Sequence, residues 1–145
     1  MKKYLKYGLI FLPLIGGFLV SMLVNFDMYK EINLPSIAPP SILFPIMWTI
    51  LYLMMGVSLY LNRNNKKNMV LFFIQLLFNY FWVFDFFLFE MFFGSFLVIV
   101  LLDVMILYMI LEFYKENKAS SYMLIPYLLW CMFASYLNWQ IYLLN

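Results

Sequence analysis

The stretch from residue 69 to residue 113 reads MVLFFIQLLFNYFWVFDFFLFEMFFGSFLVIVLLDVMILYMILEF, with no lysine or arginine and few acidic residues. A helix needs about 20 apolar residues to cross the hydrocarbon core of a bilayer, so each half of the stretch is long enough to cross it once. Residues 90–94 leave almost no loop between the halves. The stretch therefore predicts a tight antiparallel pair of membrane helices.

The rest of the chain has the same apolar character. Of its 145 residues, 67% are hydrophobic, 23% are aromatic and 11% are charged, and the mean hydropathy is +0.92. A soluble domain carries about 25% charged residues, so this chain lacks the polar side chains that would cover a water-soluble globule. The composition excludes a soluble enzyme and a disordered chain. The apolar runs are continuous rather than alternating, which disfavours a membrane β-barrel.

Five apolar runs predict an all-α, polytopic membrane protein, a bundle of five transmembrane helices in a single domain over residues 1–145. The first run is long for a signal peptide and no A-x-A-like site follows it, so we expect it to be retained. Within this run, Pro13, Gly16 and Gly17 are expected to bend the helix or to admit a close neighbour. The predicted spans cover residues 5–26, 42–61, 69–89, 92–113 and 122–144.

The connections between the spans carry most of the charge. The longest connection runs from Asp27 to Pro40, and Ser41 after it is expected to cap the second helix. With alternate connections on alternate sides, Lys30 is the single cation on one side and eight cations lie on the other. Because cytoplasmic loops carry the excess of Lys and Arg, the N-terminus is expected in the cytoplasm and the C-terminus outside. The eight cations are Lys2, Lys3, Lys6, Arg63, Lys66, Lys67, Lys115 and Lys118.

The residue types that usually carry metal or acid–base chemistry are scarce. The chain has no histidine, which excludes a Ser-His-Asp triad and a His-ligated zinc or haem site, and we expect no metal site. Its single cysteine, Cys131, is expected to pack as a small apolar residue, with a thiolate ligand to haem as the alternative. The net charge of +2 is too small to indicate a nucleic-acid partner.

Three blocks of the sequence resemble one family of membrane proteins. They read PSIAPP at residues 35–40, with Trp48 shortly after; NYFW at residues 79–82; and PYLLWCMFASYLNW at residues 126–139. On these blocks the chain resembles the translocator protein family, whose bacterial members are called tryptophan-rich sensory proteins (TspO). The animal members of this family are called peripheral benzodiazepine receptors.

The chain departs from the pattern of this family at three places. Leu34 and Ile37 stand where relatives usually carry the Lys and Trp of a Lys-Pro-x-Trp motif. Residues 82–84 read WVF in place of a Trp-Ser/Thr-Pro step. No basic residue follows Tyr136, so the cholesterol motif of animal members is absent and the resemblance does not imply cholesterol handling.

The resemblance implies a membrane sensor or carrier that binds tetrapyrroles such as protoporphyrin IX, and also isoquinoline carboxamides. No cofactor is expected to be required. Because relatives are often dimers, a homodimer is expected, in the lipid of a bacterial cell membrane. One alternative is an enzyme that degrades porphyrin in a reaction dependent on light and oxygen, with Trp48 and Trp130 as its catalytic pair. Another alternative is a non-catalytic membrane scaffold.

The resemblance also implies where the ligand binds, because Trp48 and Trp130 match cavity positions of the family. Without the resemblance, aromatic residues at helical spacing would indicate ordinary helix packing. With it, the same spacing places further candidate residues on the faces that carry Trp48 and Trp130. In the first connection, Lys30 is expected to meet a porphyrin propionate. The expected ligand-binding residues are Tyr29, Pro39, Pro40, Phe44, Trp48, Tyr52, Asn79, Trp82, Trp130, Ala134, Leu137 and Asn138.

Polar residues inside the predicted spans are a second group of candidates. Gln75 and Asn79 are expected either to join helices by hydrogen bonds or to contact the ligand, because unpaired donors in lipid are costly. A carboxylate at the centre of a span costs roughly 2.5–3.5 kcal/mol, so Asp85 and Asp103 are candidates for a polar network with Gln75. For Asp103 we expect loss of charge or bonding to Tyr, Asn or Gln. Trp139 falls on another face of its helix, where it is expected to anchor at the membrane interface.

Overall fold

The computed structural model describes residues 3–145, which form helices and connections without a strand among them. Five segments are helical, long and apolar enough to cross a membrane, and the last of them, Lys118–Leu144, combines two consecutive helices. The prediction of an all-α polytopic membrane protein is confirmed. The helices are α1 (Lys3–Ser21), α2 (Met28–Glu31), α3 (Leu43–Leu61), α4 (Lys66–Phe87), α5 (Phe92–Glu116), α6 (Lys118–Tyr122) and α7 (Ile125–Leu144).

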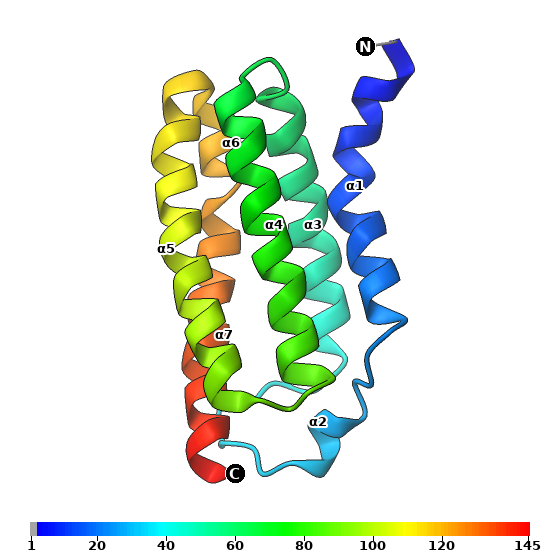
Figure 1. Cartoon of the computed structure of the whole chain (residues 1–145), viewed down its shortest axis with the longest axis vertical. Helices are drawn as coiled ribbons and strands as arrows, with labels where there is room; N and C mark the ends of the chain where they lie inside the picture. Colours follow the sequence, from blue (N-terminus) through cyan, green and yellow to red (C-terminus); the bar gives the residue numbers. More distant parts are fainter. Residues whose placement is uncertain (1–2) are drawn as a thin grey trace.

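The long helices run alternately up and down the bundle (Figure 1). The N-terminal end of α1, the α3–α4 turn and α6 lie at one end, and α2, the α4–α5 turn and the C-terminus lie at the other. This arrangement separates Lys30 from the other described cations, as the sequence predicts. Lys2 and the side chain of Lys3 lie outside the described residues. α1 packs on α3 and touches α4, while α5 packs against α4, α6 and α7.

The first span ends earlier than predicted. α1 ends at Ser21 rather than near Phe26, because the ring of Phe26 packs edge-on against Phe87 with centroids 4.8 Å apart, and the chain leaves the helix to reach it. The predicted cap at Ser41 is also wrong. α3 begins at Leu43 after Ile42, and no side chain caps it.

Three other helix ends differ from those that hydropathy predicts, and an asparagine side chain caps two of them. α4 begins at Lys66 rather than Met69 because the Asn65 side chain accepts a hydrogen bond from the Asn68 backbone N–H at 3.1 Å. α5 continues to Glu116. The region expected as a loop before the last span is helix α6, which the Asn117 side chain caps through the Ser120 N–H at 3.0 Å.

α1 and α3 approach each other closely at glycines. A Cβ built on Gly17 would lie 2.5 Å from Cε2 of Tyr52, and a Cβ on Gly56 would collide with the backbone carbonyl of Ile10. The expectation that Gly17 admits a close neighbour is therefore confirmed. Because these contacts leave no room for side chains, α1 is held against the bundle at a fixed depth.

A buried amide and hydroxyl cluster joins α3, α4 and α6 at the end of the bundle where the N-terminus lies. Asn62 Nδ2 donates to Ser120 Oγ at 2.9 Å, and Asn68 Nδ2 donates to Asn62 Oδ1 at 2.8 Å. Ser58 Oγ donates to the Ser120 carbonyl at 2.8 Å. These groups satisfy one another, so the cluster stabilises the bundle rather than offering a binding site.

Two asparagines join the first connection to the end of α7. The Asn33 backbone N–H donates to Asn145 Oδ1 at 3.1 Å, and Asn145 Nδ2 donates back to the Asn33 carbonyl at 2.9 Å. Asn33 Nδ2 also donates to the Leu144 carbonyl at 3.2 Å, which satisfies a terminal carbonyl of the helix. The Asn33–Asn145 pair therefore fixes the far part of the connection that follows α2.

We expect Asn145→Ala to loosen residues 22–42 with a loss of about 0.5–1.5 kcal/mol of local stability, because the side-chain bonds of this pair are lost. The measurement is the rate of limited proteolysis within the connection, which should rise. Asn64→Ala is the matched control, since Asn64 is exposed and forms no side-chain hydrogen bond within residues 3–145. Equal cleavage rates for the two variants would contradict this role of Asn145.

Candidate functional site

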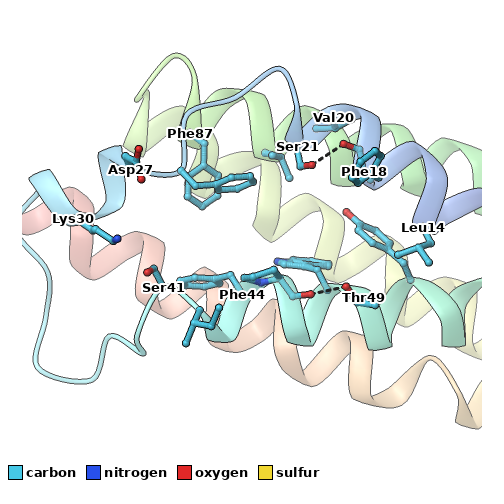
Figure 2. Close-up of a pocket in the computed structure, with 17 residues that line it drawn as sticks. Leu14, Phe18, Val20, Ser21, Asp27, Lys30, Ser41, Phe44, Thr49 and Phe87 are labelled. Carbon is cyan, nitrogen blue, oxygen red and sulfur yellow. Dashed lines mark hydrogen bonds between the residues drawn. The ribbon is translucent and has the colours of Figure 1, made fainter.

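A cavity of about 520 Å³ lies between α1, α3 and α4, with the first connection at one end (Figure 2). Ligand pockets commonly have volumes of roughly 300–1,000 Å³ and largely apolar walls, and this cavity fits both criteria. The lining residues are Leu14, Gly17, Phe18, Val20, Ser21, Phe26, Asp27, Lys30, Ser41, Ile42, Phe44, Pro45, Trp48, Thr49, Tyr52, Val83 and Phe87.

Trp48 and Tyr52 form an aromatic wall of the cavity. Their rings stack with centroids 5.3 Å apart and planes at 30°. Behind them, Trp48 contacts Trp82 at 6.4 Å and Tyr127 at 6.3 Å, centroid to centroid. The wall is positioned by α3, because residues 48 and 52 are one helical turn apart. Its flat faces provide stacking surface for a planar ligand.

Trp130, the predicted partner of Trp48, does not line the cavity. Phe44 lines it instead and packs edge-on against Trp130 with centroids 6.0 Å apart, so this phenyl ring separates Trp130 from the cavity. The indole Nε1 of Trp130 is buried and has no hydrogen-bond acceptor within residues 3–145. Helical spacing places Trp130 on the inward face correctly but does not show that Phe44 occupies the intervening space.

The mouth of the cavity carries Asp27, Lys30 and Ser41 (Figure 2). Tyr29 is buried and does not line the cavity. Its hydroxyl donates to the Pro39 carbonyl at 2.9 Å, and burial raises the pKa of the Tyr29 phenol to about 12, so it remains a donor at neutral pH. Pro39 thus shapes the connection from outside the lining, as does Pro40, which is exposed.

A hydrogen-bonded chain leads from the cavity wall into the bundle. Tyr52 Oη donates to Asn79 Oδ1 at 2.7 Å, Asn79 Nδ2 donates to Tyr127 Oη at 2.9 Å, and Tyr127 Oη donates to Gln75 Oε1 at 2.7 Å. The chain joins α3, α4 and α7 through buried groups. Of the two roles expected for Gln75 and Asn79, the structure therefore shows the interhelical hydrogen bonds. Gln75 Nε2 is left without an acceptor among the described residues.

Four other predicted ligand residues lie in the packed core. Trp82 Nε1 donates to Asn138 Oδ1 at 3.0 Å, and Asn138 Nδ2 donates to the Phe92 carbonyl at 2.8 Å. Ala134 and Leu137 are buried in the same cluster as Trp82. None of these four side chains lines the cavity, because they pack against one another in the core.

The two intramembrane aspartates do not share a hydrogen-bond network with Gln75, because each contacts a different part of the bundle. Ser135 Oγ lies 2.5 Å from Asp103 Oδ2, so Asp103 pairs with a serine rather than with the expected Tyr, Asn or Gln. Asp85 lies near the end of α4, and its Oδ2 would be 3.5 Å from a Cβ on Gly94, in the first turn of α5. A carboxylate beside a helix N-terminus is favourably placed.

Several of the cavity residues that the sequence analysis missed come from α1 and the end of α4. From α1 these are Leu14, Phe18, Val20 and Ser21, and from α4 they are Val83 and Phe87. The Gly16-Gly17 pair was the available signal in the sequence. Because Gly17 has no side chain, a large ring from a neighbouring helix can lie against α1, and the ring and the helix together form a wall of the cavity. The phenylalanines gave no signal, because they resemble lipid-facing residues.

Trp139 and Cys131 lie away from the cavity. Trp139 packs against Phe96 and Tyr142 with tilted rings, whose centroids lie 5.0 and 5.6 Å from that of Trp139, on the face of α7 away from the cavity, as its helical position predicts. Cys131 is fully buried in the core as a small apolar residue. Within residues 3–145, no three His, Cys, Asp or Glu side chains gather where they could hold a metal ion.

The fold and the cavity together define a helical integral membrane protein with a ligand-sized internal site. The chain belongs to the TspO/MBR family, whose sequence model matches residues 9–144. The Tryptophan-rich protein TspO of Chlorobaculum tepidum is 43% identical over 124 residues, 81% of this chain and 78% of the relative. A protein of the same name from Archaeoglobus fulgidus is 36% identical over 135 residues, 90% and 87% of the two chains. The Tryptophan-rich sensory protein of Cereibacter sphaeroides is 25% identical over 122 residues, 82% and 77%.

Proposed function

We propose that this protein binds a tetrapyrrole of the protoporphyrin IX type in the cavity between α1, α3 and α4, and that it acts as a membrane sensor or carrier of that ligand. The observation that carries the proposal is the stacked Trp48–Tyr52 wall of an apolar cavity with Lys30 at its mouth. A porphyrin is a wide apolar disc with carboxylates at one edge. Its disc matches the aromatic wall, and one carboxylate at its edge can meet Lys30.

Membership of a family that includes tryptophan-rich sensory proteins supports the same proposal. Isoquinoline carboxamides, which are also flat and largely apolar, are the second ligand class we propose for this cavity. The proposal includes a cell-membrane location with the N-terminus in the cytoplasm, because the end of the bundle that holds Arg63 and Lys118 carries nearly all described cations. A homodimer stays a prediction from the resemblance.

We expect protoporphyrin IX without metal to bind at least as tightly as haem. The residues that line the cavity include no His, Cys or Met, so iron finds none of these common axial ligands there. The measurement is the dissociation constant of each compound for the purified protein in detergent. Haem binding that is tighter by more than about tenfold, equivalent to 1.4 kcal/mol, would contradict this mode of recognition.

The experiment that tests the function is a titration of the purified protein with protoporphyrin IX, carried out in darkness and under light with oxygen. Quenching of tryptophan fluorescence in darkness reports binding, and saturation at one porphyrin per chain is expected. Progressive loss of the porphyrin absorption in light, at a rate that Trp48→Phe abolishes while binding survives, would favour the degrading enzyme. No quenching in either condition would favour the scaffold and refute the binding proposal.

A further inference from the structure

The mouth of the cavity carries two side chains of opposite charge. Asp27 and Lys30 both line it, one turn apart around α2 (Figure 2). Within residues 3–145, neither side chain forms an ion pair. A rim with one carboxylate and one ammonium group is therefore available to a ligand that carries both signs of charge.

The cavity also opens toward the bilayer. Phe18 of α1 and Ile42 beside the start of α3 line the cavity, yet their exposed fractions are 64% and 66%. Phe18 belongs to a membrane-spanning helix, so its exposed surface faces lipid rather than water. A molecule dissolved in the bilayer can reach the cavity between α1 and α3 without crossing the aqueous phase.

A dianionic tetrapyrrole can pair with only one of the two rim charges. One propionate can meet Lys30, but the Asp27 carboxylate then repels the negative edge of the ligand. A phospholipid with a primary ammonium in its headgroup uses both charges, because its phosphate can accept from Lys30 while its ammonium donates to Asp27. A quaternary ammonium has no N–H to donate, and a glycerol headgroup has no positive charge.

We propose that the Asp27–Lys30 rim and the cavity beneath it form a site for phosphatidylethanolamine, which enters from the bilayer between α1 and α3. One acyl chain lies in the apolar cavity beside Phe18 and Phe87, and the other stays in the surrounding lipid. The lipid occupies the site when no other ligand does. This site rests on the cavity and its rim and does not depend on tetrapyrrole binding.

The test is native mass spectrometry of the purified full chain in detergent with equal amounts of phosphatidylethanolamine, phosphatidylcholine and phosphatidylglycerol of identical acyl chains. The wild type should retain phosphatidylethanolamine about two- to fivefold more than either competitor, the size expected for partly exposed charge pairs. Asp27→Asn and Lys30→Gln should each remove the preference. Glu31→Gln is the matched control, because Glu31 is exposed and outside the cavity lining, and it should keep the preference.

Equal retention of the three lipids by the wild type, or an unchanged preference in Asp27→Asn, would overturn the proposal. Thermal melting of each variant in the same detergent checks that it is folded, and Lys30→Gln gives a second measurement at the opposite charge.

Binding of protoporphyrin IX to the same variants is measured in a separate experiment. Asp27→Asn should tighten porphyrin binding by about two- to fivefold while weakening phosphatidylethanolamine binding. Lipid preference without porphyrin binding would refute only the proposed function, and porphyrin binding without lipid preference would refute only the lipid site.

Discussion

Gly56→Ala is expected to lower the stability of the protein by about 1–3 kcal/mol and to weaken ligand binding with it. The added methyl group would collide with the backbone carbonyl of Ile10, which cannot rotate away as a side chain can. Relief requires α1 to move outward from α3. Because Leu14, Gly17 and Phe18 of α1 form one wall of the cavity, this movement also widens the site.

Gly8→Ala is the matched control for this prediction. A Cβ on Gly8 meets nothing within 4 Å, so the same substitution in the same helix pair adds no contact. Alanine is favoured over glycine inside a helix by about 1 kcal/mol, so this variant should melt at or slightly above the wild-type temperature. Thermal melting in detergent measures both variants. The close contact of α1 and α3 would be contradicted by a Gly56→Ala protein as stable as the Gly8→Ala protein.

The number and order of the membrane helices could be predicted from the sequence, because hydropathy reports directly which residues can face lipid. The helix ends could not, because side-chain contacts set them. α1 ends at Ser21 so that Phe26 can reach Phe87, a contact between residues 61 positions apart in the chain. Asn65 and Asn117 extend the helical regions beyond the apolar runs through capping bonds that hydropathy does not measure.

The candidate site could be predicted only in part. Phe44, Trp48 and Tyr52 share one face of α3, and helical spacing finds such a face reliably. Spacing cannot show which inward-facing residues border empty space and which are packed. Trp82 and Asn138 bond to each other in the core, although helical spacing groups each of them with other predicted ligand residues on its helix.

The site residues on α1 were the hardest to predict from the sequence. Its Phe18 is exposed to lipid and lines the cavity at once, so its chemistry is that of any membrane-facing residue. Only the neighbouring glycines mark this helix as a wall, because a ring as large as that of Tyr52 needs the space that a side chain at Gly17 would fill.

Trp48→Leu is expected to weaken protoporphyrin IX binding by at least about 30-fold, equivalent to 2 kcal/mol, the loss typical of an aromatic anchor at the centre of a site. Leucine keeps an apolar side chain at this position but removes the flat indole face that stacks on Tyr52 and borders the cavity. The fold should be retained, because Trp48 is only partly buried and the core behind it is held by the bonds of Asn79.

Trp139→Leu provides the comparison that makes this result specific. Trp139 packs on Phe96 and Tyr142 outside the cavity, so its removal changes the tryptophan content equally but leaves the cavity wall intact. The most direct measurement is an equilibrium titration of wild type, Trp48→Leu and Trp139→Leu with protoporphyrin IX, followed by the absorption of the porphyrin itself. Binding of a tetrapyrrole in the α1–α3–α4 cavity predicts wild-type affinity within about twofold for Trp139→Leu and a loss of at least about 30-fold for Trp48→Leu. Equal affinities for the two variants would contradict it.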